Sequence, residues 1–297
     1  MKIVVTGASG LVGSALVESL RRGGHELIRL VRHPSGDPDA AVWDPGAGTI
    51  AMDALCDVEG VVHLAGAPIA AKRWTRKTKR DILQSRVQGT RTLSEALARL
   101  PHPPRVLVSA SGVGYYGSCG DEVVNEDRPA GSGFLAEVAQ QWEQATAPAS
   151  AAGIRVVTMR LGVVLSMAGG ALPRMLLPFR FGAGGPVGNG QQYMSWITLD
   201  DVVAAVQALL KNDSLTGPVN MVAPTPVTSR EFARTLGRVL HRPSRLPLPA
   251  LAVRLMMGEM GEELLLASTR AIPDKLSASG YTFQHPALEE ALRHVLG

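Results

Sequence analysis

The sequence predicts an α/β protein built on a doubly wound parallel sheet with helices on both faces, together with a smaller, mostly helical C-terminal lobe. Short β-branched runs alternate with segments of helical apolar periodicity from residue 3 to residue 222, and this alternation is typical of parallel strands joined by crossover helices. A glycine-rich turn joins the first run to the first helical segment. Hydrophobic residues make up 45% of the chain and charged residues 19%, which excludes a disordered chain.

The first strand and helix flank three glycines. Residues 3–5 are apolar and β-branched, Gly7, Gly10 and Gly13 follow at a three-residue spacing, and helical periodicity begins over 11–22. In such a turn the first glycine permits a positive φ, the second lets backbone N–H groups approach a pyrophosphate, and the third lets the helix pack closely on the strand. The turn therefore predicts a dinucleotide site, the alternative being an ordinary glycine-rich turn. Its spacing is GxxGxxG and not GxGxxG.

The end of the second predicted strand, over 26–31, indicates which dinucleotide is bound. An NAD site places Asp or Glu there to hold the ribose 2′-hydroxyl, whereas this chain has Arg32 and His33. A guanidinium group binds a phosphate through paired, charge-assisted hydrogen bonds, so the sequence favours NADP over NAD. The alternative is that Arg32 is simply solvated at the end of its strand.

The remaining elements are placed by the same two periodicities, with Gly and Pro marking the breaks between them. In chain order we expect a short strand at 42–43, a short helix near 53, a strand over 61–66 that ends in small residues, a helix with an apolar stripe from 82 to 97, strands over 105–109 and 154–161 with a helix over 135–147 between them, a strand over 196–199, a helix over 202–210, a strand over 219–222, and helices over 232–240 and 251–268.

Two stretches leave alternatives open. Residues 72–80 carry six positive charges in nine positions, which indicates either a solvated helix face or a phosphate-binding rim. Residues 168–192 are rich in glycine and form either a flexible lid over the substrate or an ordinary long connection.

Bulk properties narrow the class of protein. A formal charge of +4 and a pI near 9.3 suit anionic small molecules, but the charge is too small and too scattered to predict nucleic-acid binding. No apolar run approaches the roughly 18 residues of a membrane span, and the beginning of the sequence does not resemble a signal peptide. Cys56 and Cys119 have no partners at metal-ligand spacing. We therefore expect a reduced, cytoplasmic protein without a metal ion.

Hydroxyl groups gather after the strand predicted over 105–109. Ser109, Ser111, Tyr115 and Tyr116 all lie within eight positions, at the carboxyl end of a strand, where doubly wound sheets bind their ligands. They are the first candidates for polar groups that face a substrate.

Several stretches together resemble the extended short-chain dehydrogenase/reductase superfamily of the NAD-dependent epimerase/dehydratase type, whose usual substrates are sugar nucleotides. They are TGASGLVG at 6–13, HLAG at 63–66, Tyr116 with Gly117, Arg160, the segment 196–202 and Asn220. More narrowly, the stretches at 67–69, 73–74, 85–86, 131–136, 142–143 and 177–179 resemble its epimerase-like subfamily of NADP-dependent oxidoreductases. The resemblance extends over the whole chain and implies a Rossmann fold.

The resemblance also implies a set of residues that hold NADP. Those expected at the pyrophosphate are Gly7, Ser9, Gly10, Leu11, Val12 and Gly13; those near the adenosine phosphate are Arg32 and His33; and those along the adenine and its ribose are Leu64, Ala65 and Gly66. Arg86 stands where most members have an asparagine, and we expect it to reach the cofactor phosphates with Asp81 orienting it. Val164 is expected near the nicotinamide.

The catalytic residues of the superfamily are not preserved. Its members use a Tyr as general acid/base, a Lys four residues later that lowers its pKa, and a Ser or Thr that binds the reacting oxygen. In this chain Gly112 occupies the hydroxyl position, Phe134 or Leu135 that of the Tyr, and Val138 or Ala139 that of the Lys.

Two interpretations follow. In the first, the protein is an NADP(H)-dependent oxidoreductase or epimerase that has rebuilt its acid/base from Ser111, Tyr115 and Tyr116, and acts on a small carbonyl or hydroxyl compound or a sugar nucleotide. In the second, it binds NADP(H) without turnover, as a sensor or regulatory protein. We expect a dinucleotide-binding domain over 1–164, completed by 196–222, and a substrate lobe over 165–195 and 223–297. The oligomeric state stays open, a homodimer being common among relatives.

Overall fold

A central parallel sheet organises the structure, a computed structural model that describes residues 1–34 and 36–297. Its strands and those of the smaller sheets are β1 (Lys2–Thr6), β2 (Glu26–Val31), β3 (Ala40–Asp44), β4 (Thr49–Ile50), β5 (Gly60–His63), β6 (Val106–Gly112), β7 (Val123–Val124), β8 (Arg155–Leu161), β9 (Val163–Leu165), β10 (Tyr193–Met194), β11 (Trp196–Thr198), β12 (Gly217–Met221), β13 (Val227–Thr228) and β14 (Arg270–Ala271).

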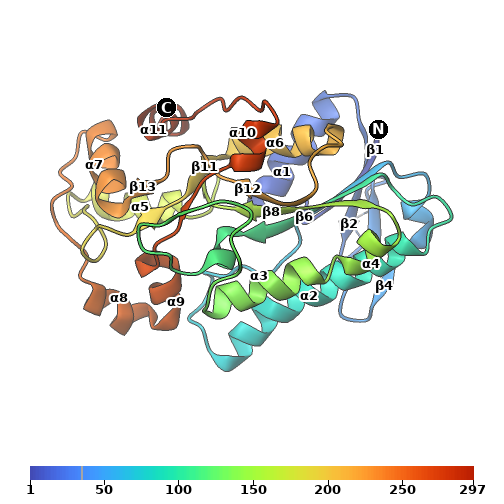
Figure 1. Cartoon of the computed structure of the whole chain (residues 1–297), viewed down its shortest axis with the longest axis horizontal. Coiled ribbons are helices and arrows are strands. Elements are labelled where there is room, and N and C mark those ends of the chain that lie inside the picture. The colour runs from blue at the N-terminus through green and yellow to red at the C-terminus, as the bar shows by residue number, and fades with distance from the viewer. Residues whose placement is uncertain (35) are drawn as a thin grey trace.

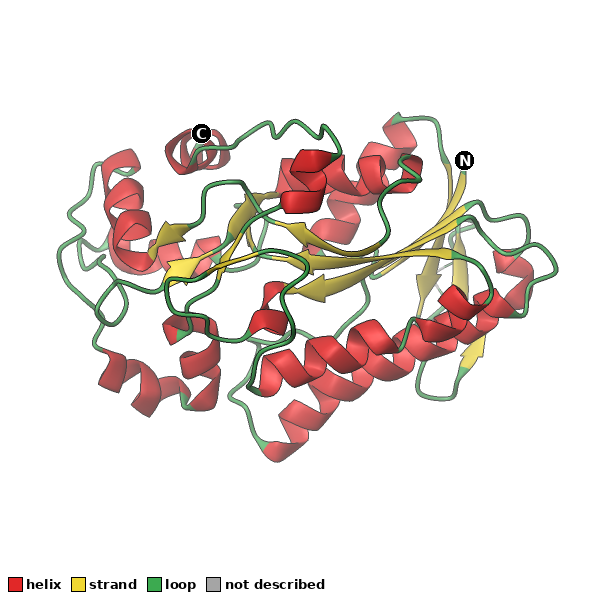
Figure 2. Cartoon of the chain, viewed as in Figure 1, coloured by secondary structure: helices red, strands yellow, loops and turns green. Residues whose placement is uncertain are grey.

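Helices cover this sheet and build the smaller lobe (Figure 2). They are α1 (Leu11–Arg22), α2 (Arg76–Ala98), α3 (Phe134–Gln144), α4 (Ala147–Ala151), α5 (Leu172–Arg180), α6 (Leu199–Lys211), α7 (Ser229–Val239), α8 (Ala250–Met257), α9 (Glu259–Gly261), α10 (Asp274–Ala278) and α11 (Leu288–Leu296), with short 3₁₀ turns η1 (Met52–Leu55) and η2 (Val113–Tyr116) and a π turn η3 (Glu262–Leu266).

The main sheet has eight strands in the order β12-β8-β6-β5-β1-β2-β3-β4. All neighbouring pairs are parallel except β3 with β4. The strand order reverses beside β1, since β2 lies on one side of it and β5 on the other. The predicted doubly wound sheet is confirmed, and the place where such sheets bind ligands is the carboxyl edge between β1 and β5.

The apolar run of β1 explains how the sheet is covered. Ile3 and Val5 belong to the core cluster that holds α1, α6 and α10 side chains, whereas Val4 belongs to the cluster with α2 and α4. Successive side chains of a strand point to opposite faces, so a strand that is apolar at every position must be covered on both. Figure 1 shows α2, α3 and α4 on one face and α1, α6 and α10 on the other.

Several predicted boundaries agree with the structure, since α1 and β2 span the predicted residues. Others differ. The strand predicted over 105–109 continues as β6 to Gly112. The stretch 168–192, which left a choice between a lid and a plain connection, contains the helix α5. The single helix expected over 251–268 is wrong, because Gly258 with φ of +59° ends α8 and the chain restarts as α9 and η3.

The smaller lobe has its own core, formed by side chains of α5, α7 and α11 around Trp196. The predicted division into two domains stays a prediction, and its first boundary, at 164, falls inside β9, which pairs with β11. Of the helices in the described part of the chain, none combines the length and apolar character of a membrane span.

One buried carboxylate ties the C-terminal segment to the main body. Asp201, in the first turn of α6, is 0% exposed. Its Oδ1 accepts hydrogen bonds from the Tyr281 hydroxyl (3.3 Å) and the Gln284 N–H (2.7 Å), and its Oδ2 accepts from the Thr198 hydroxyl and the His285 N–H (both 3.0 Å). Both oxygens are therefore satisfied, and residues 281–285 are fixed against α6.

Candidate functional site

The turn after β1 leaves no room for side chains. Gly7 has φ of +67°, and a Cβ there would lie 2.7 Å from the carbonyl carbon of Leu64. A Cβ on Gly13 would lie 2.2 Å from the Gly7 carbonyl oxygen. Because Gly10 is the N-cap of α1 and supplies no side-chain cap, N–H groups of the first turn remain available to an anion. Ser9 and Gly10 are exposed, while Leu11 and Val12 are half-buried.

A buried histidine fixes the neighbouring end of β5. The Thr6 hydroxyl accepts hydrogen bonds from the Leu64 and Ala65 N–H groups (3.1 and 3.2 Å), so its own proton is directed to His63 Nδ1 at 2.7 Å. Nδ1 must then be the acceptor, and Nε2–H donates to the Thr90 hydroxyl at 2.9 Å. Burial lowers the pKa of His63 to about 4, so the ring is neutral. These hydrogen bonds hold the backbone at Leu64 and Ala65 against the glycine turn.

Arg86 is a cation without an acidic partner among the described residues. Its Nη1 donates to the carbonyl oxygens of Ala67 (3.0 Å) and Ile82 (3.1 Å), and its guanidinium stacks 4.9 Å from the ring centre of Trp142. Burial lowers its pKa to about 10, which leaves it charged at neutral pH. A cation in this setting, with donors to spare, fits an anionic ligand.

Asp81 is exposed, and the carbonyl oxygens described above are the groups that hold the Arg86 guanidinium; the role of Asp81 in orienting Arg86 stays a prediction. A Cβ on Gly66, which is exposed, would lie 3.2 Å from Arg86 Cζ. Arg86 therefore borders the Leu64–Gly66 segment, which the sequence predicts to line the adenine and ribose.

The other predicted cofactor residues lie around the same edge. Arg32 and His33 directly follow β2 and are exposed. Val164 lies on β9, and a Cβ on Gly170 would meet both the Val164 carbonyl oxygen (3.6 Å) and Leu11 Cδ2 (3.1 Å). The structure thus brings Val164 close to the start of α1, although they are far apart in the sequence.

Hydroxyl groups at the end of β6 form one buried network. The Ser111 hydroxyl donates to Glu143 Oε1 at 2.7 Å, and Glu143 accepts two bonds of 2.9 Å from Arg160. Arg160 Nη1 also donates to the Tyr116 hydroxyl (3.0 Å), which donates to Asn220 Oδ1 (2.7 Å). Ser111 is 3% and Tyr116 2% exposed. Arg160 thus links β8 to α3, η2 and, through Tyr116, to β12.

Electrostatics in this network favours a charged Arg160 and a neutral Tyr116. Burial alone would lower the pKa of Arg160, yet the hydrogen bonds and charge of Glu143 raise it above its ordinary value. Burial raises the pKa of Tyr116 to about 12. Tyr115 is half-buried, and the Arg160 guanidinium covers its ring, 3.4 Å from the centre. Of the three hydroxyl candidates, Tyr116 is the one whose oxygen has both a donor and an acceptor.

The start of α3, where the superfamily places its Tyr and Lys, is apolar. Phe134 and Val138 pack with Ile82 in a small core cluster. The first turn of α3 is capped from the other lobe, because the Glu263 carboxylate accepts the N–H groups of Phe134 (2.7 Å) and Leu135 (2.8 Å). Sequence reasoning missed Glu143 and Glu263, since each acts on residues distant in the sequence.

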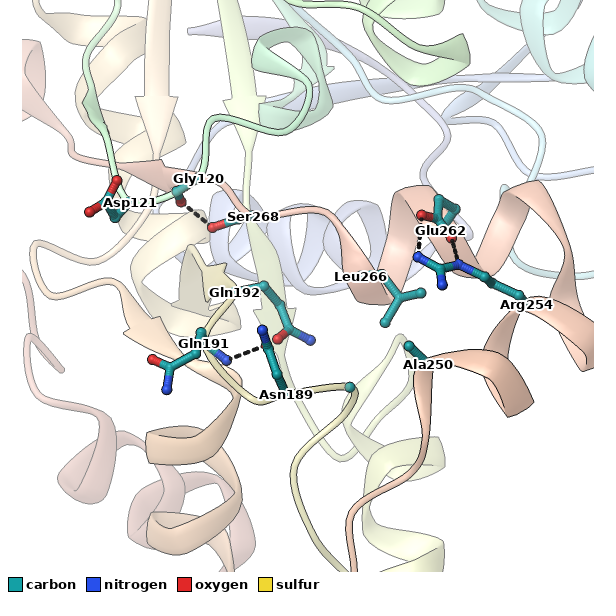
Figure 3. Close-up of a pocket in the computed structure, with 11 residues that line it drawn as sticks. Gly120, Asp121, Asn189, Gln191, Gln192, Ala250, Arg254, Glu262, Leu266 and Ser268 are labelled. Atoms are coloured by element: carbon teal, nitrogen blue, oxygen red, sulfur yellow. Dashed lines mark hydrogen bonds and ion pairs between the residues drawn. The ribbon is translucent and has the colours of Figure 1, made fainter.

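A pocket of about 580 Å³ opens in the smaller lobe (Figure 3). Polar side chains on the loop at 189–192 form one wall, and the ion-paired Arg254 and Glu262 form another. Its complete lining is Gly120, Asp121, Gly188, Asn189, Gln191, Gln192, Ala250, Arg254, Glu262, Leu266 and Ser268. Apart from Gly120 and Asp121, its lining residues belong to the segments where the sequence predicts the substrate lobe.

Comparisons with known proteins agree with this geometry. The sequence model of the NAD dependent epimerase/dehydratase family matches residues 3–222, and a domain of unknown function (DUF1731) matches 248–295. The epimerase family protein MT2273 of Mycobacterium tuberculosis is 45% identical over 290 residues, covering 98% of this chain and 96% of that protein.

Two solved structures are also similar over nearly the whole chain. The human epimerase family protein SDR39U1, crystallised with NADPH, superposes with a TM-score of 0.90 at 34% identity. The match covers 99% of this chain and 99% of that one. A nucleoside-diphosphate sugar epimerase from Corynebacterium glutamicum has a TM-score of 0.83 at 37% identity, over 100% of this chain and 58% of that one. This protein therefore belongs to the NAD-dependent epimerase/dehydratase family.

Proposed function

We propose that this protein binds NADP(H) at the carboxyl edge of β1 and β5 and uses it as an epimerase-like oxidoreductase. The observation that carries the proposal is the glycine turn, whose Gly7 and Gly13 leave no space for a side chain, together with the cation Arg86, for which the described residues supply no acidic partner. Backbone N–H groups at the start of α1 and a guanidinium nearby are complementary to a pyrophosphate. The NADPH bound to human SDR39U1 supports the choice of ligand.

Arg32 supports NADP over NAD. It is exposed directly after β2, where an acidic residue would bind the ribose 2′-hydroxyl of NAD. Arg29, three residues earlier on β2, is already ion-paired with Asp37. Arg32 and the adjacent His33 are therefore the groups that we assign to the 2′-phosphate.

When bound, NADP(H) would supply hydride transfer, and this chain's own groups would orient the substrate. Ser111 and Tyr115 are the hydroxyl groups that we assign to the reacting oxygen. Tyr116 supports them indirectly, because its hydroxyl is shared between Arg160 and Asn220. The substrate class that we propose is a small carbonyl or hydroxyl compound or a sugar nucleotide. Since Cys56 and Cys119 are free thiols, the proposal includes a reducing, cytoplasmic setting.

A second function is favoured by one specific observation. The Ser111 hydroxyl donates to Glu143, and no Tyr or Lys stands at the start of α3. A site whose Ser111 and Tyr116 hydroxyl groups donate to internal partners is suited to binding NADP(H) without turnover, as a sensor or regulatory protein.

Fluorescence titration with NADPH and NADH tests the cofactor. Because a hydrogen bond to a charged group contributes about 1.5–3 kcal/mol, we expect Arg86→Ala to weaken NADPH binding about 10- to 100-fold. Arg91→Ala, an exposed position on the same helix, is the matched control and should bind normally. Arg32→Ala should remove the preference for NADPH over NADH. Equal affinity of the wild type for both nucleotides, or binding of neither, would refute the proposal.

Turnover is tested separately, by screening carbonyl compounds and sugar nucleotides for NADPH oxidation. Ser111→Ala and Tyr115→Phe should abolish activity without loss of NADPH binding, while Tyr116→Phe should lower stability as well. Tight NADPH binding without oxidation by any substrate class would favour the sensor function.

A further inference from the structure

An aspartate and two histidines meet on the side of the molecule where the C-terminal helix returns to the main body. Asp200 lies in the first turn of α6, His294 in the last turn of α11, and His285 in the loop before α11. One ligand atom from each lies within 4.8 Å of the other two. We call this group the Asp–His cluster. It lies outside the cofactor edge and plays no part in the function proposed above.

The cluster is partly assembled before any ligand arrives. His294 Nε2 lies 2.9 Å from Asp200 Oδ2, and the rings of His285 and His294 are stacked 4.1 Å apart with an interplanar angle of 21°. The backbone of His285 is fixed by its N–H bond to buried Asp201. Two of the three side chains therefore project from helix ends, and the third from a loop anchored beside them.

The chemistry of this donor set points to a transition-metal ion. Two imidazoles and one carboxylate are ligands that Zn²⁺ accepts, with bonds of about 2.0–2.2 Å and tetrahedral geometry. Such bonds place ligand atoms roughly 3.4 Å apart, so the His294–Asp200 hydrogen bond of 2.9 Å must open slightly to admit the ion. Asp200 and His294 are about half exposed, so small rotations can complete the site.

The stacked rings lie close enough to share one ion but must turn to do so. Each imidazole binds a metal through a lone pair in the plane of its ring, and the two ring planes are now nearly parallel. We propose that the Asp–His cluster binds a divalent transition-metal ion, for which Zn²⁺ is the probe, and that the ion fastens the segment matched by the domain of unknown function to the epimerase-family segment. The sequence predicts no such site because its ligands are separated by up to 94 residues.

Isothermal titration of the untagged, EDTA-dialysed protein with ZnCl₂ tests this proposal. We expect one ion per chain and a rise in Tm that EDTA reverses. His285→Gln and His294→Gln should each weaken binding by more than about tenfold, the lower limit for changes even in groups that only support metal ligands. His102→Gln, at an exposed position outside the cluster, should bind Zn²⁺ as the wild type does.

Two outcomes would overturn the proposal. If the cluster variants bind Zn²⁺ as tightly as the wild type, the ion occupies another site. If the wild type binds only at millimolar concentration, Asp200 and His294 form an ordinary ion pair and the ion is adventitious. Asp200→Asn keeps the shape of the side chain and serves as a third variant if a histidine change impairs folding. NADPH affinity, measured in parallel, should be unchanged throughout.

Discussion

Protonation of the buried His63 should contribute to the loss of stability of this fold in acid. His63 is 0% exposed and bonded on both ring nitrogens, to Thr6 and Thr90. A proton added to Nδ1 would face the Thr6 hydroxyl, whose proton already points at it. Burial lowers the pKa of His63 from its ordinary 6.5 to about 4, so the unfolded chain takes up the proton first as the pH falls.

The sign and size of the pH effect follow from the difference between the pKa of His63 in the folded and in the unfolded chain. Above about pH 6.5 the histidine is neutral in both the folded and the unfolded chain, so it does not change the free energy of unfolding. As the pH falls from 6.5 towards 4, the unfolded chain binds a proton that the folded chain does not, and the free energy of unfolding decreases. The shift from 6.5 to about 4 corresponds to about 3 kcal/mol in total. Most of it, about 2 to 3 kcal/mol, should be lost between roughly pH 7.5 and pH 4.5.

Urea unfolding at these two pH values measures the effect. His63→Asn keeps an acceptor for Thr6 but does not titrate. Between the two pH values the free energy of unfolding should therefore fall about 2 to 3 kcal/mol less in this variant than in the wild type. His102→Gln, at an exposed position, is the matched control and should behave as the wild type. Equal pH dependence in His63→Asn and the wild type would show that His63 is protonated as easily in the fold as outside it.

Three further changes test contacts that hold the site. Gly13→Ala forces a Cβ to 2.2 Å from a backbone oxygen. It should lower the free energy of unfolding in urea by about 1–3 kcal/mol and abolish NADPH binding. Normal NADPH binding would contradict the role given to the glycine turn. Glu143→Gln leaves Arg160, 3% exposed, without its charge partner; calorimetry should show a Tm lowered by at least about 6 °C, and an unchanged Tm would mean that the pair is not buried in solution. Glu263→Gln weakens the cap of α3 and should lower the free energy of unfolding by about 1 kcal/mol. Glu259→Gln breaks only a partly exposed ion pair and should lower it less. Equal effects of the two variants would show that Glu263 does not act as a cap.

The fold was predictable because its signals are local. Helix α1 begins after Gly10 and ends before Gly23, and both boundaries follow from glycine in the printed sequence. The break at Gly258 was not predicted, because the Met-rich stretch on both sides of it was interpreted as one helix, although Gly258, with φ of +59°, is the residue that ends α8.

The candidate site was only half predictable, for the same physical reason. The glycine turn is a local motif, and Arg86 could be singled out as an unusual residue on its helix. The partners that hold Arg86, however, are the carbonyl oxygens of Ala67 and Ile82, and carbonyl groups carry no sequence signal. Ser111 and Glu143 are 32 positions apart, so their bond depends on how α3 packs on β6.

The carboxylate of Asp201 has a consequence for the unity of the chain. Removal of residues 281–285 would leave a carboxyl group in the interior with three of its hydrogen bonds lost, a loss of several kcal/mol. That is a large fraction of the stability of an ordinary domain. The C-terminal segment therefore cannot detach while the rest stays native, and we expect both parts to melt in a single cooperative transition, as one foldon and not as two modules.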